Sequence, residues 1–167
     1  MLRIDHVTEP GEQLKIIVEL FKAYEMELDE DICFQSFEKE LANPLYKYGP
    51  PYGTLLLAYW NEEPVGCVAL QPLPAENGLT VCEMKRLYVK PEHRKNKIGN
   101  ALVDLIMEVA IKLGYDKMKL DTLEKLQAAI NMYVKKGFIT TNAYYENPLN
   151  GVVYMEKELK VDKPVIH

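Results

Sequence analysis

The sequence has little of what a disulfide framework, a metal site or a membrane anchor requires. Its 167 residues include three cysteines, an odd number without CxxC spacing, which argues against a disulfide framework and a zinc site. No apolar run approaches the ~20 residues that a membrane-spanning helix needs. The first residues read as a strand rather than a signal peptide. We therefore expect a cytoplasmic protein with reduced thiols, no membrane partner and no metal.

The chain also lacks internal repeats and low-complexity segments. Its hydrophobic fraction of 48% and charged fraction of 27% are ordinary for a globular protein. The length suits one domain, which we expect over residues 1–160, followed by a tail over 161–167. The net charge of −5 argues against a nucleic-acid partner. It suits an amine substrate, although many acidic proteins have no such ligand.

Apolar periodicity and turn residues predict an α/β (α+β) fold, with one mixed central sheet flanked by helices on both faces. The predicted strands cover residues 2–7, 53–60, 65–70, 81–90, 117–121, 138–145 and 152–159. The predicted helices cover residues 12–28, 34–42, a stretch from 98 to a cap at Gly114, and 123–136. Prolines and glycines predict loops over residues 43–53 and 71–79.

Positive charge is concentrated where the strand over residues 81–90 leads into the helix at residue 98. Residues 85–97 contain six lysines or arginines and one glutamate, although the whole chain is acidic. A helix N-terminus offers unpaired backbone N–H groups and the positive end of its dipole, which bind phosphate. The pattern predicts a site for a phosphorylated ligand. A solvated basic turn is the alternative reading.

Residues 86–102 resemble the acyl-CoA signature of the GNAT superfamily of N-acyltransferases, with Arg94 in its first position and Gly99 in its last. Residues 129–138 are similar to a later helix of that family, including Tyr133 and a closing Gly-Phe. The likeness extends over residues 2–159. A bacterial subgroup without a settled substrate has motifs similar to residues 82–89, 120–123 and 147–148. The resemblance implies the GNAT fold and transfer of an acetyl group from acetyl-CoA to a primary amine.

The basic turn departs from the family pattern, which usually has glycine where this chain has Lys97 and often where it has Lys95. Glycine permits a positive φ and close approach of a ligand to the backbone. Two interpretations follow. Either the turn holds a conformation that lysine tolerates, or the site is degenerate and binds cofactor weakly. The first is favoured because Arg94, Gly99 and the helix register agree with the family.

The resemblance also implies which residues hold the cofactor. Backbone contacts from the strand and N–H groups from the turn are expected, with added charge from Arg94 and Lys97. The predicted cofactor-binding residues are Leu87, Tyr88, Val89, Arg94, Lys95, Asn96, Lys97, Ile98, Gly99 and Asn100. The side chains of the three strand residues are expected to lie mostly in the core.

Two side chains are candidates for the chemistry. Glu83, on the predicted face of Leu87, is a candidate general base, because the attacking amine must be neutral. The alternative is an edge carboxylate paired with a neighbouring lysine or arginine. Tyr133 occupies the family position from which a phenol protonates the CoA thiolate, and its alternative is a core tyrosine. Cys82 is expected on the opposite face, which argues against an acyl-cysteine route.

The acceptor site is predicted only from topology, with ordinary packing as the alternative. Its candidates are Tyr24, Glu27, Phe34, Tyr144, Tyr145 and Asn147. The resemblance implies a small-molecule or peptide amine as the acceptor, and a homodimer is compatible with it. Two other functions stay open: an acyl-CoA sensor without catalysis, and a degenerate protein that has the fold alone.

Overall fold

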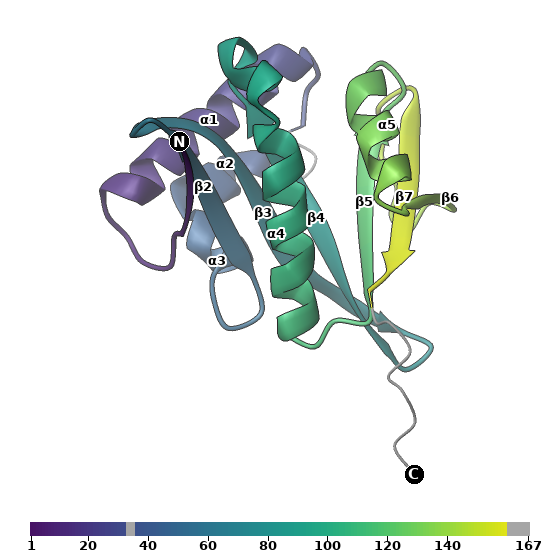
Figure 1. Ribbon diagram of the computed structural model, residues 1–167. Coiled ribbons are helices and arrows are strands. Elements are labelled where there is room, and N and C mark those ends of the chain that lie inside the picture. Colours follow the sequence, from purple (N-terminus) through teal and green to yellow (C-terminus); the bar gives the residue numbers. More distant parts are fainter. Residues whose placement is uncertain (33–35, 160–167) are drawn as a thin grey trace. The chain divides into compact units, whose positions relative to one another are not determined.

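A computed structural model of the chain describes residues 1–32 and 36–159 (Figure 1). The strands are β1 (Leu2–His6), β2 (Thr54–Trp60), β3 (Glu63–Glu76), β4 (Leu79–Val89), β5 (Lys117–Leu123), β6 (Ile139–Thr141) and β7 (Val152–Glu158). The helices are α1 (Glu12–Leu28), α2 (Phe37–Ala42), α3 (Pro44–Tyr48), the 3-10 helix η2 (Pro91–Asn96), α4 (Ile98–Lys112) and α5 (Gln127–Lys135). The predicted tail over 161–167 lies outside the described residues.

The strands hydrogen-bond in the order β1-β2-β3-β4-β5-β7-β6. Strand β4 runs parallel to β5, whereas β1 with β2, β2 with β3, β5 with β7 and β6 with β7 are antiparallel. The sheet is therefore mixed, and the predicted fold class is confirmed.

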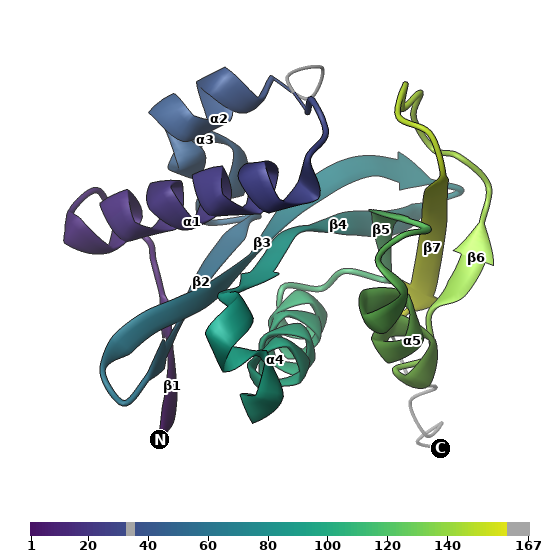
Figure 2. The ribbon, with the colours of Figure 1, turned by 90° about the horizontal axis from the view of Figure 1, so that it is seen from above.

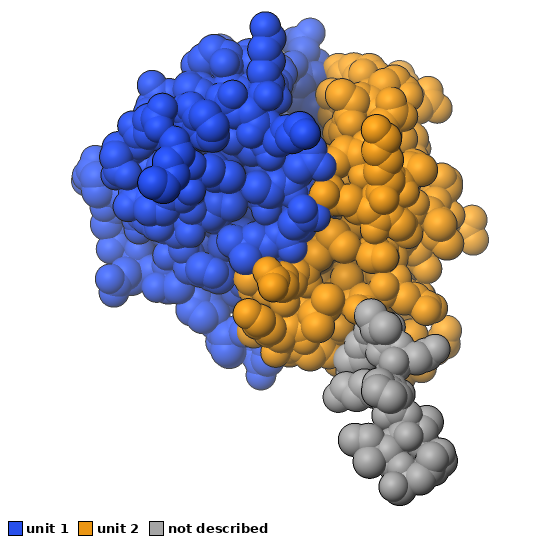
Figure 3. Space-filling view, in the orientation of Figure 1, with its two compact units in different colours: residues 1–71, 84–106 blue, residues 72–83, 107–167 orange. Residues whose placement is uncertain are grey.

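The chain divides into two compact units (Figure 3). The first unit comprises residues 1–71 and 84–106. Within it, α1, α2 and α3 lie on one side of the strands and the first part of α4 lies on the other (Figure 2). Its core includes Phe21 of α1, which packs edge-to-face on Tyr48 of α3 with ring centroids 6.0 Å apart, and Leu102 of α4. The apolar residues of α1 recur at helical spacing, which is why the sequence predicted this helix with its observed bounds.

The second unit comprises residues 72–83 and the chain from 107 onward. It holds β5, β7, β6 and α5, together with the end of β3 and the start of β4. Met118 and Leu120 of β5 and Met155 of β7 are buried, and Phe138 lies in the core between α5 and β6. Gly137 ends α5 with φ +97°, as its position after the last helical residue predicted.

Two loop predictions are wrong in the first half of the chain. Residues 43–53 include the helix α3, which begins at Pro44, because proline suits the first position of a helix. Residues 71–79 are mostly strand, and the turn is limited to Asn77 and Gly78, both with positive φ. The pairing of β3 with β2 ends at Leu70, so the later prolines of β3 interrupt no bond to β2.

Two boundaries differ in the second half of the chain. The predicted helix over 123–136 begins only at Gln127, because β5 continues to Leu123, which pairs with Val152 of β7. The predicted strand over 138–145 is limited to β6, whose last pair is Thr141 with Tyr154. The tyrosines that follow belong to a loop and hydrogen-bond through their side chains. The predicted helix over 34–42 is observed from Phe37, and residues 34–35 lie outside the described residues.

Candidate active site

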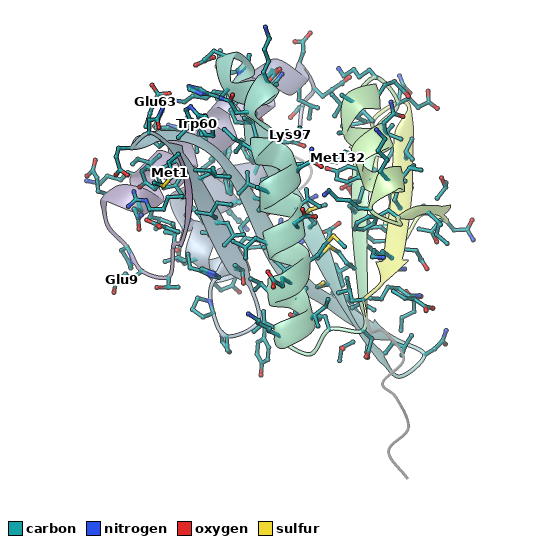
Figure 4. All side chains as sticks on the ribbon, in the orientation of Figure 1. Met1, Glu9, Trp60, Glu63, Lys97 and Met132 are labelled. Atoms are coloured by element: carbon teal, nitrogen blue, oxygen red, sulfur yellow. The ribbon has the colours of Figure 1, made fainter. Side chains whose placement is uncertain are left out.

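The basic turn of the first unit connects the end of β4 to α4 through η2. Lys97 (Figure 4) lies between η2 and α4. Its backbone has φ 57° and ψ 28°, which is the left-handed region. A side chain costs roughly 1–2 kcal/mol in this region, which is why glycine is common there. Lysine nevertheless adopts this backbone conformation in the structure, and the effect of Lys97 on cofactor binding stays a prediction.

The start of α4 presents backbone N–H groups at this turn. A hydrogen bond of 3.2 Å runs from the Ala101 N–H to the Lys97 carbonyl, and the N–H groups of residues 98–100 precede it without an acceptor inside the helix. A Cβ added to Gly99 would meet only Val89 Cγ2 at 3.9 Å, an ordinary contact. Packing within the protein therefore does not require glycine there. Glycine leaves this backbone open to close approach by a ligand.

The predicted cofactor residues divide by side-chain exposure. Ile98, Tyr88 and Val89 are buried, which confirms the core role expected for the last two. Those at least partly exposed are Leu87, Arg94, Lys95, Asn96, Lys97, Gly99 and Asn100. The exposed residues of the turn would therefore contact a cofactor through the side chains of lysine and asparagine and through the backbone.

Arg94 holds the turn against the rest of the first unit. Its Nε donates to the Val89 carbonyl at 2.9 Å, and its Nη2 hydrogen-bonds the carboxylate of Glu27 on α1. Its guanidinium lies 5.7 Å from the centroid of the Tyr88 ring. The bond to Glu27 raises the pKa of Arg94. Arg94 thus links the end of β4 to α1, and Glu27, an acceptor candidate from the sequence, is engaged with it.

Strand β4 is irregular immediately before the turn, because Arg86 has φ 59°. A left-handed residue breaks the alternation of side chains along a strand. The prediction of unbroken alternation from Glu83 to Leu87 is therefore wrong at Arg86. The guanidinium of Arg86, a neighbouring arginine that the sequence offered as a partner for Glu83, hydrogen-bonds another carboxylate.

That carboxylate is Glu40 of α2. Arg86 Nε donates to Glu40 Oε2 at 2.7 Å and Nη2 donates to Oε1 at 3.0 Å. The Tyr48 hydroxyl donates to Oε1 at 2.8 Å, and Lys47 Nζ lies 3.2 Å from the same atom. Glu40 and Arg86 are each 3% exposed. Burial alone would raise the pKa of Glu40, but the bond and charge of Arg86 hold it below its ordinary value.

The Arg86 guanidinium also lies over aromatic rings, 5.2 Å from the Phe37 centroid and 5.8 Å from that of Tyr24. Tyr24, an acceptor candidate from the sequence, therefore belongs to this buried cluster of the first unit. Sequence reasoning missed the cluster, because residues 40 and 86 are far apart in the chain. The signal available was local: Lys47, seven residues after Glu40, contacts the same carboxylate.

The second unit holds the candidate base. Glu83 is 3% exposed, and its Oε2 accepts a hydrogen bond of 2.6 Å from the Tyr144 hydroxyl. It lies on β4 opposite Lys119 of β5 in the parallel register. Burial and the nearby charge of Glu83 raise the pKa of Tyr144, so the phenol keeps its proton and acts as a donor. The structure thus brings together Glu83 and a loop tyrosine that the sequence associated only with the acceptor.

A second tyrosine and carboxylate pair lies in the same unit. The Tyr145 hydroxyl hydrogen-bonds Asp121 of β5, and Asn147 Nδ2 donates to Asp121 Oδ2 and to the Tyr145 oxygen, each at 3.0 Å. Asn147 Oδ1 also accepts from the Leu149 N–H at 3.0 Å. The acceptor candidates Tyr145 and Asn147 are therefore engaged in tying the loop to β5. Phe34, the remaining acceptor candidate, lies outside the described residues.

Tyr133 is buried on α5, where its ring packs on Phe138 with centroids 5.8 Å apart. This position agrees with the alternative reading as a core tyrosine and leaves the catalytic role a prediction. Cys82 is buried, with its thiol 3.5 Å from the Lys117 carbonyl, and burial raises its pKa. Little of the thiolate that an acyl-cysteine route needs would form, which agrees with the sequence argument against it.

Across residues 1–32 and 36–159, no helix has the length and apolar character that a membrane crossing requires. In this described part of the chain, no three His, Cys, Asp or Glu side chains are grouped so that they could hold a metal ion.

Comparison with known proteins identifies the family. The acetyltransferase (GNAT) family matches residues 15–138. An uncharacterized N-acetyltransferase of Schizosaccharomyces pombe is 47% identical over 141 residues, which cover 84% of this chain and 85% of that protein. An acetyltransferase structure from Streptococcus agalactiae has a TM-score of 0.76 at 21% identity, covering 94% of this chain and 98% of that one.

PaiA N-acetyltransferase from Thermoplasma acidophilum, solved in complex with coenzyme A, has a TM-score of 0.67 at 19% identity over 95% of this chain and 99% of that one. At these identities the two structures establish the fold. The match of the family to three quarters of the chain, together with the fission-yeast relative, establishes the lineage. The chain belongs to the GNAT acetyltransferase family.

Proposed function

We propose that this protein transfers an acetyl group from acetyl-CoA to a primary amine. The observation that carries the proposal is the turn between β4 and α4, where Lys97 has the left-handed backbone and Gly99 leaves the helix N-terminus accessible. The family membership supports it, as does the coenzyme A in the complex of the PaiA structure. The cofactor chemistry expected of this turn is recognition of a pyrophosphate.

The turn would bind the phosphates mainly through its backbone. The N–H groups of residues 98–100 and the positive end of the α4 dipole would face the anion, and the exposed ammonium groups of Lys95 and Lys97 would add charge. Arg94, engaged by Val89 and Glu27, would act by holding the turn in shape. This role differs from the direct phosphate contact that the resemblance implied.

The proposed reaction is direct attack by the amine. Glu83 removes the proton that makes the acceptor an ammonium ion, and the neutral nitrogen then attacks the thioester carbonyl carbon. A backbone N–H near Leu87 polarises that carbonyl. The new C–N bond forms, the C–S bond breaks, and Tyr133 gives its proton to the departing thiolate, regaining one from the amine or from solvent. Unchanged turnover in a Tyr133→Phe variant would remove this last role.

A buried carboxylate beside tyrosine rings suits an amine, but the polar groups of Tyr145 and Asn147 are already engaged with Asp121. The kind of amine therefore stays a prediction. The cytoplasmic location, the single domain over 1–160 and the homodimer are also predictions.

Isothermal titration with CoA and acetyl-CoA, followed by a screen for CoA release with primary amines, tests the function. We expect Gly99→Ala to weaken binding of both by about 10- to 100-fold, since the added methyl group would displace charge-assisted backbone hydrogen bonds. Its thermal unfolding should match that of the unaltered protein, because the Cβ meets only Val89 at 3.9 Å. Equal binding by Gly99→Ala would contradict the proposed phosphate site. Binding without turnover of any amine would favour a sensor.

A further inference from the structure

The hydrogen bond between Tyr144 and Glu83 joins a buried carboxylate to a loop that follows β6. The phenol donates to Glu83 Oε2 over 2.6 Å, and Glu83 is among the most buried charged residues of the second unit. A carboxylate has about four lone-pair sites, so it can accept this bond and still interact with another donor. Donation to the ionised form favours that form over the protonated one.

The Tyr144 ring is held in place from several sides. Its centroid lies 5.4 Å from that of Tyr145 and 5.4 Å from that of Tyr154 on β7, and the last two are 5.8 Å apart. Tyr145 is bound to Asp121, and the Tyr154 hydroxyl donates to the Tyr145 carbonyl at 3.0 Å. This packing fixes the direction in which the phenol donates.

Other charged groups surround the pair. Lys119, the register partner of Glu83, has its Nζ 5.2 Å from the Tyr144 ring centroid. Its ammonium is bound by Glu76 Oε2 at 2.6 Å and lies 3.8 Å from Glu156 Oε1, so its charge is matched by carboxylates. Asp121 and Tyr145 face the cluster from β5 and the loop, and the Cys82 thiol adjoins Glu83 on β4.

We propose that Tyr144 is a positioning residue for the base of the acetyl transfer, orienting the Glu83 carboxylate and keeping it ready to accept a proton. The inference rests on the proposed function, in which Glu83 deprotonates the acceptor. The phenol itself stays protonated and takes no part in the proton balance: the proton moves from the ammonium group to the carboxylate. Tyr144 acts only through the orientation and charge state of that carboxylate.

The test compares Tyr144→Phe with Tyr154→Phe. Both variants delete one hydroxyl from the same ring cluster, but only Tyr144 donates to Glu83. The measurement is a carbon-13 NMR titration of the Glu83 side-chain carboxyl, assigned by its absence in Glu83→Gln. It requires no ligand. We expect the titration curve of this carboxyl to move to higher pH in Tyr144→Phe, since the charged form loses a donor. In Tyr154→Phe it should stay unchanged.

Turnover of acetyl-CoA with methylamine as the probe then links the bond to catalysis. The acid limb of kcat/KM should move in the same direction in Tyr144→Phe and stay in place in Tyr154→Phe. Titration curves that coincide in Tyr144→Phe and the unaltered protein would overturn the inference alone, while Glu83→Gln still loses activity. Full activity in Glu83→Gln would instead remove the base, and with it both the proposed function of Glu83 and this inference.

Discussion

Glu40 in the first unit and Glu83 in the second are two carboxylates buried to the same extent, each 3% exposed. Glu40 is held by the guanidinium of Arg86 through two hydrogen bonds, with Lys47 also in contact. Glu83 is held by the neutral phenol of Tyr144. The charged partner of Glu40 holds its pKa below the ordinary value and ties this carboxylate to the fold. We therefore assign a structural role to Glu40 and keep the proposed base role for Glu83.

Replacement of each carboxylate by an amide should give the largest difference between Glu40 and Glu83. In Glu40→Gln the charge of Arg86 is left buried without its counter-charge, so the free energy of unfolding should fall by about 3–5 kcal/mol. In Glu83→Gln the rate of acetyl transfer should fall roughly 10²- to 10⁴-fold with a much smaller loss of stability. Urea unfolding of both variants measures the loss of stability, and CoA release by both variants measures the loss of activity. A large loss of stability in Glu83→Gln with normal turnover would reverse the assignment.

A fall in pH should remove the contribution of the Glu40 ion pair to stability in the unaltered protein. The pKa of Glu40 in the folded protein is lowered from its ordinary value of 4.5, so its pair stabilises the fold above that pH. The contribution is lost as the pH falls through the lower folded value. Urea midpoints measured from neutral pH down to about pH 3 should therefore converge for the unaltered protein and Glu40→Gln. A gap that stays constant to the lowest pH would contradict the role of the Glu40 charge.

Removal of the tyrosine hydroxyl that bonds each carboxylate should have the smallest effect. It tests whether the partners of Glu40 and Glu83 have different roles. Tyr48→Phe removes a 2.8 Å hydrogen bond to Glu40 and should lower the free energy of unfolding by about 1.5–3 kcal/mol. Because Arg86 remains bound to Glu40, the pH dependence of turnover should stay unchanged. Tyr144→Phe, the equivalent deletion at Glu83, is expected to move that dependence. Matching pH profiles for the two variants would show that the two phenols have equivalent roles.

Much of the fold was predictable because its signals are local. The apolar spacing of α1, the basic turn before α4 and the Gly137 cap each depend on neighbouring residues, and each appears where the sequence placed it. The errors occurred where pairing partners decide the outcome. Strand β3 runs past two prolines because the chain reverses only at Asn77 and Gly78, and β5 extends to Leu123 because β7 pairs with it there.

The sequence by itself determined the family, the order of the strands along the chain and the concentration of positive charge at the turn before α4, since these follow from short motifs and from periodicity. The tertiary structure decided the partners of Glu40, Glu83 and Asp121. Arg86 lies 46 residues from Glu40, and Tyr144 lies 61 residues from Glu83. No local pattern encodes such pairs, because a buried charge takes whichever donor the folded chain brings within hydrogen-bonding distance.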